Sequence, residues 1–523
     1  MKLSGRKIIL LTLLGVLVVG GLGVAIYYWR AKRAVMVYRQ HLIAAGEKLT
    51  VKELIPPTPA KEEDGAELFY KAQVLMNASS SGLLSTNPPL SMRGVAPGKA
   101  AVGWLQPDIR DGKATNTWDD LADTVAGMTR ELELLDQLAD KRTTDFKFNY
   151  NQGFAGLLPM LAPRKQASQN LTAAIVSAMH EGDSELATTH LRGLLGLVRG
   201  SQEERFIISQ LVRFAIVGIA QASSWDYLQS TNASDAELEA VQRDWMALDF
   251  ALPTERALEM ERARSEMTIG NMRESRAEFS RVTSGFVVGA GGGAASTGDF
   301  AERMTDFAKD TWGKTKDGSK EAAWRVAWSY PDQLRMLKGS QVHIETLRSA
   351  RSNGNFSAAI QLQKSRLSGL GIANILPDEE SSSFSGNGPN LQIMFTEGIL
   401  YADLLINKVV VIEAGKQLTV TAIALKRFKL RHGNFPADLA ALVPEFLPVV
   451  PLDPVNAQPL HYKPNADGTF LLYSVGEDAK DNGGDPTSTN PKTFWWQRGR
   501  DWVWPQPASA QEIEDHFQRK QRK

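Results

Sequence analysis

The hydrophobic positions of this chain begin with an unbroken run close to the N-terminus. Ile8–Trp29 comprises 22 residues without a charge, about 33 Å of helix at roughly 1.5 Å per residue, which is enough to cross a bilayer. No small-x-small cleavage site follows the run, so it predicts an uncleaved anchor and not a signal peptide. Basic residues flank both of its ends: Lys2, Arg6, Lys7, Arg30, Lys32 and Arg33.

Because these positive charges lie on both sides, the charge pattern leaves the membrane orientation open. A short N-terminal tail with the bulk of the chain exported is the more common arrangement, and we expect it here. The chain is therefore expected to cross the cell inner membrane once, with Ile8–Trp29 in the lipid bilayer and the bulk of the chain extracytoplasmic.

From Trp118 to about Ser280 the apolar positions recur with a helical period. Leu171–Gly200 predicts two helices joined by a tight turn, with Gly182 as the left-handed C-cap. Ser234 and Glu237 have the spacing of a capping box. Consecutive hairpins of this kind predict a helical, repeat-like domain or bundle, without a clean repeat period. One apolar stripe consists of Leu121, Val125, Met128, Leu132 and Leu135.

Phe206–Leu228 is apolar on nearly all sides, which predicts the central buried helix of this domain. Its length would also suit a membrane span. Four polar positions argue instead for a soluble core: Gln210, Arg213, Gln221 and Asp226.

Polar and glycine-rich stretches divide the chain. Residues 77–117 predict a long surface loop, 283–299 a Gly/Ala/Ser linker, and 377–390 a second polar break. The expected division is 1–33 (tail and anchor), 34–280 (helical domain), 281–390 (Gly/Ser-rich and helical connection), 391–505 (α+β head) and 506–523 (charged tail).

Composition narrows the possible functions. The chain has 523 residues, enough for two or three domains. Its 59 basic residues balance 59 acidic ones, so no global field favours nucleic acid. It contains no cysteine, which excludes disulfides, thiolate metal sites and cysteine nucleophiles.

Sequence motifs for catalysis or cofactor binding are lacking as well. The seven histidines form no zinc-binding pair, and His180 and His190 are expected on the surface. The glycine cluster near residue 290 lacks the lysine of a phosphate loop, and there is no nucleophile elbow. We therefore expect no catalytic residue and no cofactor-binding residue.

The C-terminal part predicts one long helix, from Leu391 to Arg431, on a small antiparallel sheet. Gly433 is its expected C-cap, and Asn465–Gly468 is a hairpin-turn signal between short strands. The basic stretch Lys426–His432 is expected to be a solvated helix face. Trp495, Trp496, Trp502 and Trp504 can form a platform for sugars or a partner, and we favour a strand that packs on the helix.

Tyr473–Asp485, "YSVGEDAKDNGGD", gathers four carboxylates among glycines. Oxygen ligands on a flexible backbone suit calcium. A solvated loop is the alternative, and a general acid/base pair is disfavoured because nothing indicates the burial that separates two carboxyl pKa values.

Three motifs in order, "ALKRFKLRHGNFP", "LDPVNAQPLHY" and "YSVGEDAKDNGGD", resemble the head of the major pseudopilin of type II secretion systems. The resemblance covers about Leu418 to Asp485. It implies a calcium-binding loop that stabilises the head, with backbone carbonyls completing the shell. The metal ligands carried over are Ser474, Asp478, Asp481 and Asp485.

The N-terminus departs from that family, because "SGRKIILLTLL" has neither the processed leader nor the glutamate of a fibre subunit. The remainder of the chain is similar to uncharacterised membrane-anchored bacterial envelope proteins. We therefore expect a non-catalytic envelope protein with a helical interaction scaffold and a calcium-stabilised head, whose partners are envelope or pilin-like proteins. An accessory component of a type II secretion or pilus-like system, and a hydrolase with an unrecognised site in the helical domain, are the alternatives.

Overall fold

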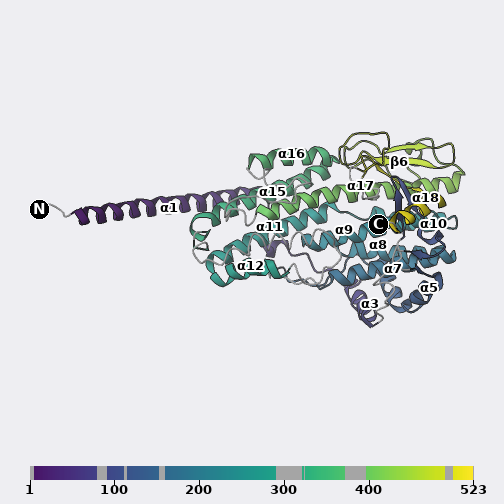
Figure 1. Ribbon diagram of the computed structural model, residues 1–523, viewed down its shortest axis with the longest axis horizontal. Coiled ribbons are helices and arrows are strands. Elements are labelled where there is room, and N and C mark those ends of the chain that lie inside the picture. Colours follow the sequence, from purple (N-terminus) through teal and green to yellow (C-terminus); the bar gives the residue numbers. More distant parts are fainter. Residues whose placement is uncertain are drawn as a thin grey trace.

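Figure 1 shows the computed structural model, in which the N-terminal helix α1 stands out from an elongated, mainly helical body. The structure describes residues 5–78, 91–110, 115–151, 159–289, 321–322, 324–370, 396–488 and 499–521.

The helices of the N-terminal half are α1 (Gly5–Ala44), α2 (Val51–Leu54), α3 (Ala66–Ala78), η1 (Gly103–Leu105), α5 (Trp118–Ala126), α6 (Thr129–Asp136), η2 (Gln137–Asp140), α7 (Leu161–Glu181), α8 (Ser184–Gly200), α9 (Ile207–Tyr227) and α10 (Asp235–Met246). Those that follow are α11 (Ala251–Glu274), α12 (Arg276–Gly289), η4 (Trp324–Trp328), α15 (Ser329–Asn353), α16 (Phe356–Gly369), α17 (Thr396–His432), η7 (Leu439–Leu442) and α18 (Ala510–Gln521).

The strands are short and form small sheets. They are β1 (Arg93–Ala96), β2 (Lys99–Ala101), β3 (Ile109–Arg110), β4 (Thr115–Asn116), β5 (His461–Pro464), β6 (Phe470–Ser474), β7 (Trp502–Val503) and β8 (Gln506–Pro507). Within the described residues the sheet orders are β1-β2-β8, β3-β4 and β5-β6-β7. The predicted mainly-α class is therefore confirmed.

The predicted hairpin of the helical domain is confirmed in α7 and α8. Gly182 ends α7 in the left-handed conformation (φ 81°), and the Asp183 carboxylate caps α8 by accepting from the Leu186 amide at 2.9 Å. The glycines of α8 allow close packing on η2. At Gly196 an added Cβ would lie 2.3 Å from the Leu138 carbonyl, so the main chains could not approach as they do.

Two described helices are long and apolar enough to cross a membrane, α1 and α9. The residues of α9 are mostly inside the body, as the polar positions predicted. Arg213 is fully buried there: its Nε donates to the Val198 carbonyl at 2.9 Å, and its guanidinium lies over the Phe250 ring at 4.7 Å. The Nε–H of Arg213 is thus satisfied by protein, as a core requires of a buried donor.

The expectation of a long surface loop over 77–117 is wrong for its described part. Val95 and Ala100 are buried, and β1 pairs with β2. Strand β2 also pairs in parallel with β8, which lies about four hundred residues further along the chain. A local pattern cannot reveal this partner, because each strand is only a few residues long.

The C-terminal hairpin is as predicted. Strands β5 and β6 pair in register through the Asn465–Gly468 turn, and Gly433 (φ 82°) caps α17. Trp502, in β7, and Trp504 are buried in the main core, whereas Trp495 and Trp496 lie outside the described residues.

The basic stretch at the end of α17 is a solvated face only in its last residues, Leu430 to His432. Arg427 is buried and binds the carboxylate of Asp235 on α10 at 2.8 Å, which Arg431 also contacts. Lys426 donates to the carbonyls of Leu228 and Ser230. These cations join α17 to the helical domain, and one hydrophobic core runs from Ala66 to Trp504.

A buried ionic cluster lies just after the C-terminal end of α1, around Glu47. The Glu47 carboxylate accepts hydrogen bonds from Arg262 (3.0 Å), Gln341 (3.0 Å) and Arg348. Arg348 also contacts Glu255 at 2.8 Å. Burial by itself would raise the pKa of Glu47, but the hydrogen bonds from Arg348, Gln341 and Arg262 lower it to about 2.

Replacing Arg262 is expected to destabilise the body. Arg262→Met leaves the buried Glu47 carboxylate with fewer donors, which should lower the free energy of unfolding by about 3–5 kcal/mol. Denaturant unfolding of the detergent-solubilised chain, followed by tryptophan fluorescence, measures this. Arg366→Ala, which breaks an exposed pair with Glu345, is the control and should cost less than about 1 kcal/mol. Equal losses in the two variants would contradict a structural role of the cluster.

Candidate functional site

The acidic stretch leaves the end of β6 as a loop rich in left-handed glycines. Gly476, Gly483 and Gly484 all have positive φ (68°, 73° and 79°). At Gly476 an added Cβ would lie 2.0 Å from the Arg500 carbonyl oxygen, so a glycine is required there. These residues let the chain fold back against the segment before β7.

Ser474 is buried and already engaged. Its hydroxyl donates to Asp453 at 2.9 Å, and the other Asp453 oxygen accepts from the Val475 amide at 2.9 Å. Burial raises the pKa of Asp453, opposed by the hydrogen bonds from Val455, Val475 and Ser474. The L-D-P stretch therefore binds the base of the loop through this carboxylate.

A second buried carboxylate, Asp501, organises the far part of the loop. Its Oδ2 accepts hydrogen bonds from three backbone amides of the loop, those of Asn482 (3.1 Å), Gly484 (2.7 Å) and Asp485 (3.0 Å). Amides that converge on one anion in this way form an anion-binding nest. Sequence reasoning missed Asp501, because it stands alone among tryptophans and arginines with no acidic neighbour to mark it.

The remaining three predicted ligands lie nearer the surface, and each caps its own turn. The Gly483 amide and the Tyr473 hydroxyl (2.8 Å) donate to Asp481 and lower its pKa. Thr487 donates to Asp485 through its hydroxyl and its amide and lowers the pKa of Asp485. Asp478 accepts from the Lys480 amide at 3.0 Å.

The predicted ligands therefore fit calcium only in part. Ser474 is turned inward to Asp453, and no three histidine or acidic residues of the described chain converge as a metal site does. Asp478 and Asp481 remain exposed, with oxygens of the type that calcium prefers. Calcium at this loop stays a prediction, and the contacts of the loop are made by protein groups.

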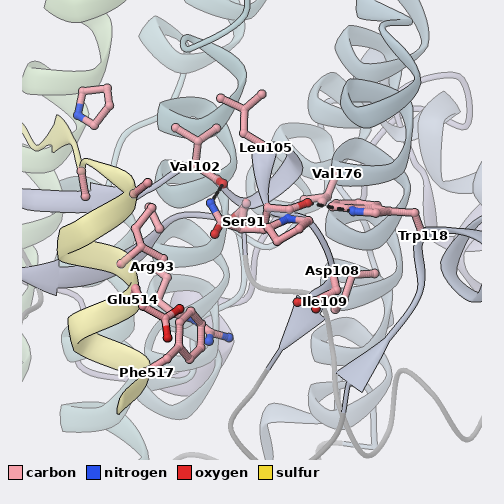
Figure 2. Close-up of a pocket in the computed structure, with 18 residues that line it drawn as sticks. Ser91, Arg93, Val102, Leu105, Asp108, Ile109, Trp118, Val176, Glu514 and Phe517 are labelled. Atoms are coloured by element: carbon pink, nitrogen blue, oxygen red, sulfur yellow. Dashed lines mark hydrogen bonds between the residues drawn. The ribbon is translucent and has the colours of Figure 1, made fainter. Parts of the chain in front are cut away.

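A separate cavity of about 400 Å³ lies between β1, β2, α18 and α7. Its wall is mostly apolar and includes Val102, Ile109, Val176 and Phe517. Figure 2 shows Arg93, Glu514 and Phe517 grouped on one side of this pocket and Trp118 on another. A volume of this size is typical of sites for small molecules or for single large side chains.

Hydrogen bonds and stacking hold the Trp118 wall in place. Its indole Nε1 donates to the Gln106 carbonyl at 2.9 Å, a contact drawn in Figure 2. The ring stacks on His180 with centroids 3.8 Å apart, and His180 Nδ1–H donates to the Trp104 carbonyl. His180 is exposed, as expected. His190 was also expected on the surface, and this was wrong: it is buried, with its Nδ1 3.0 Å from Asp136 Oδ1.

Asp226, at the end of α9, binds Gly103, which lines the pocket, and the neighbouring Trp104. Its Oδ1 accepts from the Gly103 amide at 2.8 Å, and its carbonyl accepts from the Trp104 indole at 3.1 Å. Oδ2 is buried and accepts no hydrogen bond from the described residues. Burial raises the pKa of Asp226 to about 8, which the Gly103 and Trp104 amides only partly oppose.

Comparison of the chain with protein-family models, with curated proteins and with solved structures finds no match. The likeness to pseudopilin heads therefore depends on the three ordered motifs alone.

Asp226 should make stability fall as the pH rises. Its folded pKa of about 8 lies above the value of about 3.9 in an unfolded chain, so between these values only the folded chain holds the proton. Between about pH 5.5 and about pH 8 the free energy of unfolding should therefore fall by about 2–3 kcal/mol. Asp226→Asn keeps the Oδ1 acceptor and should remove that loss in unfolding experiments at the two pH values. The exposed Asp119→Asn is the control; a wild-type slope retained in Asp226→Asn would refute the assignment.

Proposed function

We propose that this chain is a non-catalytic, single-pass envelope protein of the cell inner membrane, with its bulk extracytoplasmic. The helical body acts as an interaction scaffold, and the C-terminal α+β part is a pseudopilin-like head whose acidic loop binds calcium. The observation that carries the proposal is the exposed apolar surface of α1.

The apolar part of α1 has no protein around it. None of its most apolar window is buried, and Leu14, Val19 and Leu22 are among its exposed side chains. In water such a helix would leave a large apolar surface uncovered, whereas a bilayer covers it. Figure 1 shows this helix projecting away from the body.

The same helix continues into the body without a break, which suits an anchor that holds a scaffold in a set orientation. Tyr28 packs edge-on against Tyr330 with centroids 5.1 Å apart, and Arg39 pairs with Glu266 at 2.9 Å. Val35 and Leu42, in the part of α1 that lies along the body, are both buried. Helix α18, which lines the pocket, lies at the end of the body away from the N-terminal part of α1 (Figure 1).

A second candidate is an accessory component of a type II secretion or pilus-like system. The order of α17, the Gly433–Pro436 turn, the β5–β6 hairpin and the acidic loop favours it, since these are the parts that resemble a pseudopilin head. Recovery of a pilin-like protein with the solubilised chain would distinguish this role from a general scaffold.

Catalysis receives no comparable support. The acids whose pKa is raised toward neutrality, Asp226 (about 8) and Asp332 (about 7), do not line the pocket. A hydrolase would need such groups to converge on a substrate.

Removal of residues 1–29 is expected to release the chain from the membrane. The full-length protein should sediment with membranes and resist alkaline carbonate, and the shortened chain should be soluble. Val18→Arg combined with Val19→Arg should weaken insertion, at about 2.5–3.5 kcal/mol for each charge. Protease added from the extracytoplasmic side should digest the body. Extraction of the full-length chain by carbonate would refute the anchor.

Calcium should raise the melting temperature of the full-length chain, because a ligand that binds only the folded state stabilises it by about 2.7 kcal/mol at 100 times its Kd. Melts with chelator and with added calcium measure this. The variant Asp478→Asn/Asp481→Asn/Asp485→Asn should lose the shift, with magnesium as the control ion. An unchanged midpoint in the wild type would remove calcium from the proposal.

A further inference from the structure

The body meets α1 at the point where the apolar run of α1 ends. Tyr28 is the first described residue of α1 that is half-buried, whereas the described side chains from Leu13 to Tyr27 are exposed. The apolar run closes one residue later, at Trp29. At roughly 1.5 Å per residue the run is about as long as the hydrocarbon core of a bilayer is thick. No length of α1 is therefore left to hold the body away from the membrane surface.

The direction of α15 shows which part of the body reaches this level. Three contacts join α15 to α1 and the residues just after it, and their positions increase together along both segments: Tyr28 with Tyr330, Tyr38 with Lys338, and Glu47 with Arg348. The two helices are therefore parallel, and the first residues of α15 lie nearest the membrane. Helix η4 directly precedes α15 and also packs on α1. Figure 1 shows α12 and α15 toward the end of the body from which α1 emerges.

The surface at this end combines an exposed aliphatic side chain with aromatic rings. Val326, in η4, is 47% exposed, and Trp328 and Tyr330 are partly exposed. Both rings also pack on a small hydrophobic cluster that is separate from the main core. On α1, Tyr27 and Trp29 are exposed at the same level. Rings of this kind are typical of the membrane–water interface, where they lie among the lipid headgroups.

Basic side chains accompany this surface. Three basic residues follow the apolar run within residues 30–33, and the chain has no acidic residue before Glu47. On the body, Arg276 and Arg325 share the carboxylate of Glu321, at 3.3 Å and 3.0 Å. Cations therefore outnumber carboxylates among these residues, which suits the phosphate groups of lipid headgroups.

We propose that the end of the body formed by η4 and the start of α15 lies on the bilayer surface, with Val326, Trp328 and Tyr330 among the lipid headgroups. This is a second, peripheral membrane contact beside α1, and it rests on α1 being the membrane anchor. Lipid is the occupant because α1 sets the height of the body: its first contact with the body coincides with the end of the membrane-spanning run.

A fluorophore on a single cysteine tests the contact, because the chain contains no cysteine of its own. The full-length Val326→Cys variant is labelled with NBD and reconstituted into phosphatidylcholine–phosphatidylglycerol vesicles. Lipid that carries a nitroxide near its headgroup should quench the label about twofold or more, since a side chain in the headgroup region lies within about 5–10 Å of it. Leu452→Cys is the matched control: Leu452 is 48% exposed on the head, just before β5, and a label there should not be quenched.

A longer α1 separates the contact from the anchor. Seven helical residues, Ala-Glu-Ala-Ala-Lys-Ala-Ala, inserted between Ile26 and Tyr27 add about 10.5 Å and turn the body by only about 20°, at 1.5 Å and 100° per residue. Every contact between the body and α1 from Tyr28 onward is kept, but the body is lifted from the membrane. Quenching of the label on Val326→Cys should be lost, while the chain still floats with the vesicles.

Equal quenching of labels on Val326→Cys and Leu452→Cys, or quenching that survives the insertion, would overturn the lipid contact. Flotation of the vesicles measures the anchor separately. A chain that floats without selective quenching keeps its anchor and loses only this contact, whereas a chain that does not float loses both.

Discussion

The binding of Glu47 by Arg262, Gln341 and Arg348 connects the two parts of this protein. Glu47 follows α1 by three residues, and its carboxylate is buried between α11 and α15. A buried charge is tolerated only when donors surround it, so the chain that leaves α1 has one position in which this carboxylate is satisfied. The hydrogen bonds of Glu47 therefore tie the end of α1 to α11 and α15.

The same principle organises the C-terminal part. Asp453 and Asp501 are buried carboxylates that accept hydrogen bonds from backbone amides of the loop between β6 and β7. Asp235, on α10, accepts hydrogen bonds from the guanidinium groups of α17 and so joins the two helices. The exposed Asp478 and Asp481 accept hydrogen bonds from amides two residues away in the loop, whereas Asp453 and Asp501 accept them from amides distant in the chain. An ion at the loop would therefore add to a structure that its own protein contacts already hold.

Local signals predicted the elements well. The apolar run of α1, the Gly182 turn, the Ser234 capping box and the β5–β6 hairpin are each encoded within a few residues, and each is present. The errors concern residues whose partners are distant in the chain. His190 binds Asp136, Arg427 binds Asp235, and β2 pairs with β8, so neither hydropathy nor spacing could show that they are buried.

The candidate sites divide in the same way. The sequence by itself determined the long apolar helix α1 and the acidic loop, because length, apolarity and carboxylate density are properties of contiguous residues. Tertiary structure alone decided that Ser474 faces Asp453, that Asp501 collects the loop amides, and that the C-terminal helix α18 closes one side of a pocket against β1. These arrangements depend on groups brought together from far apart in the chain, and only the packing of the whole body determines which of them meet.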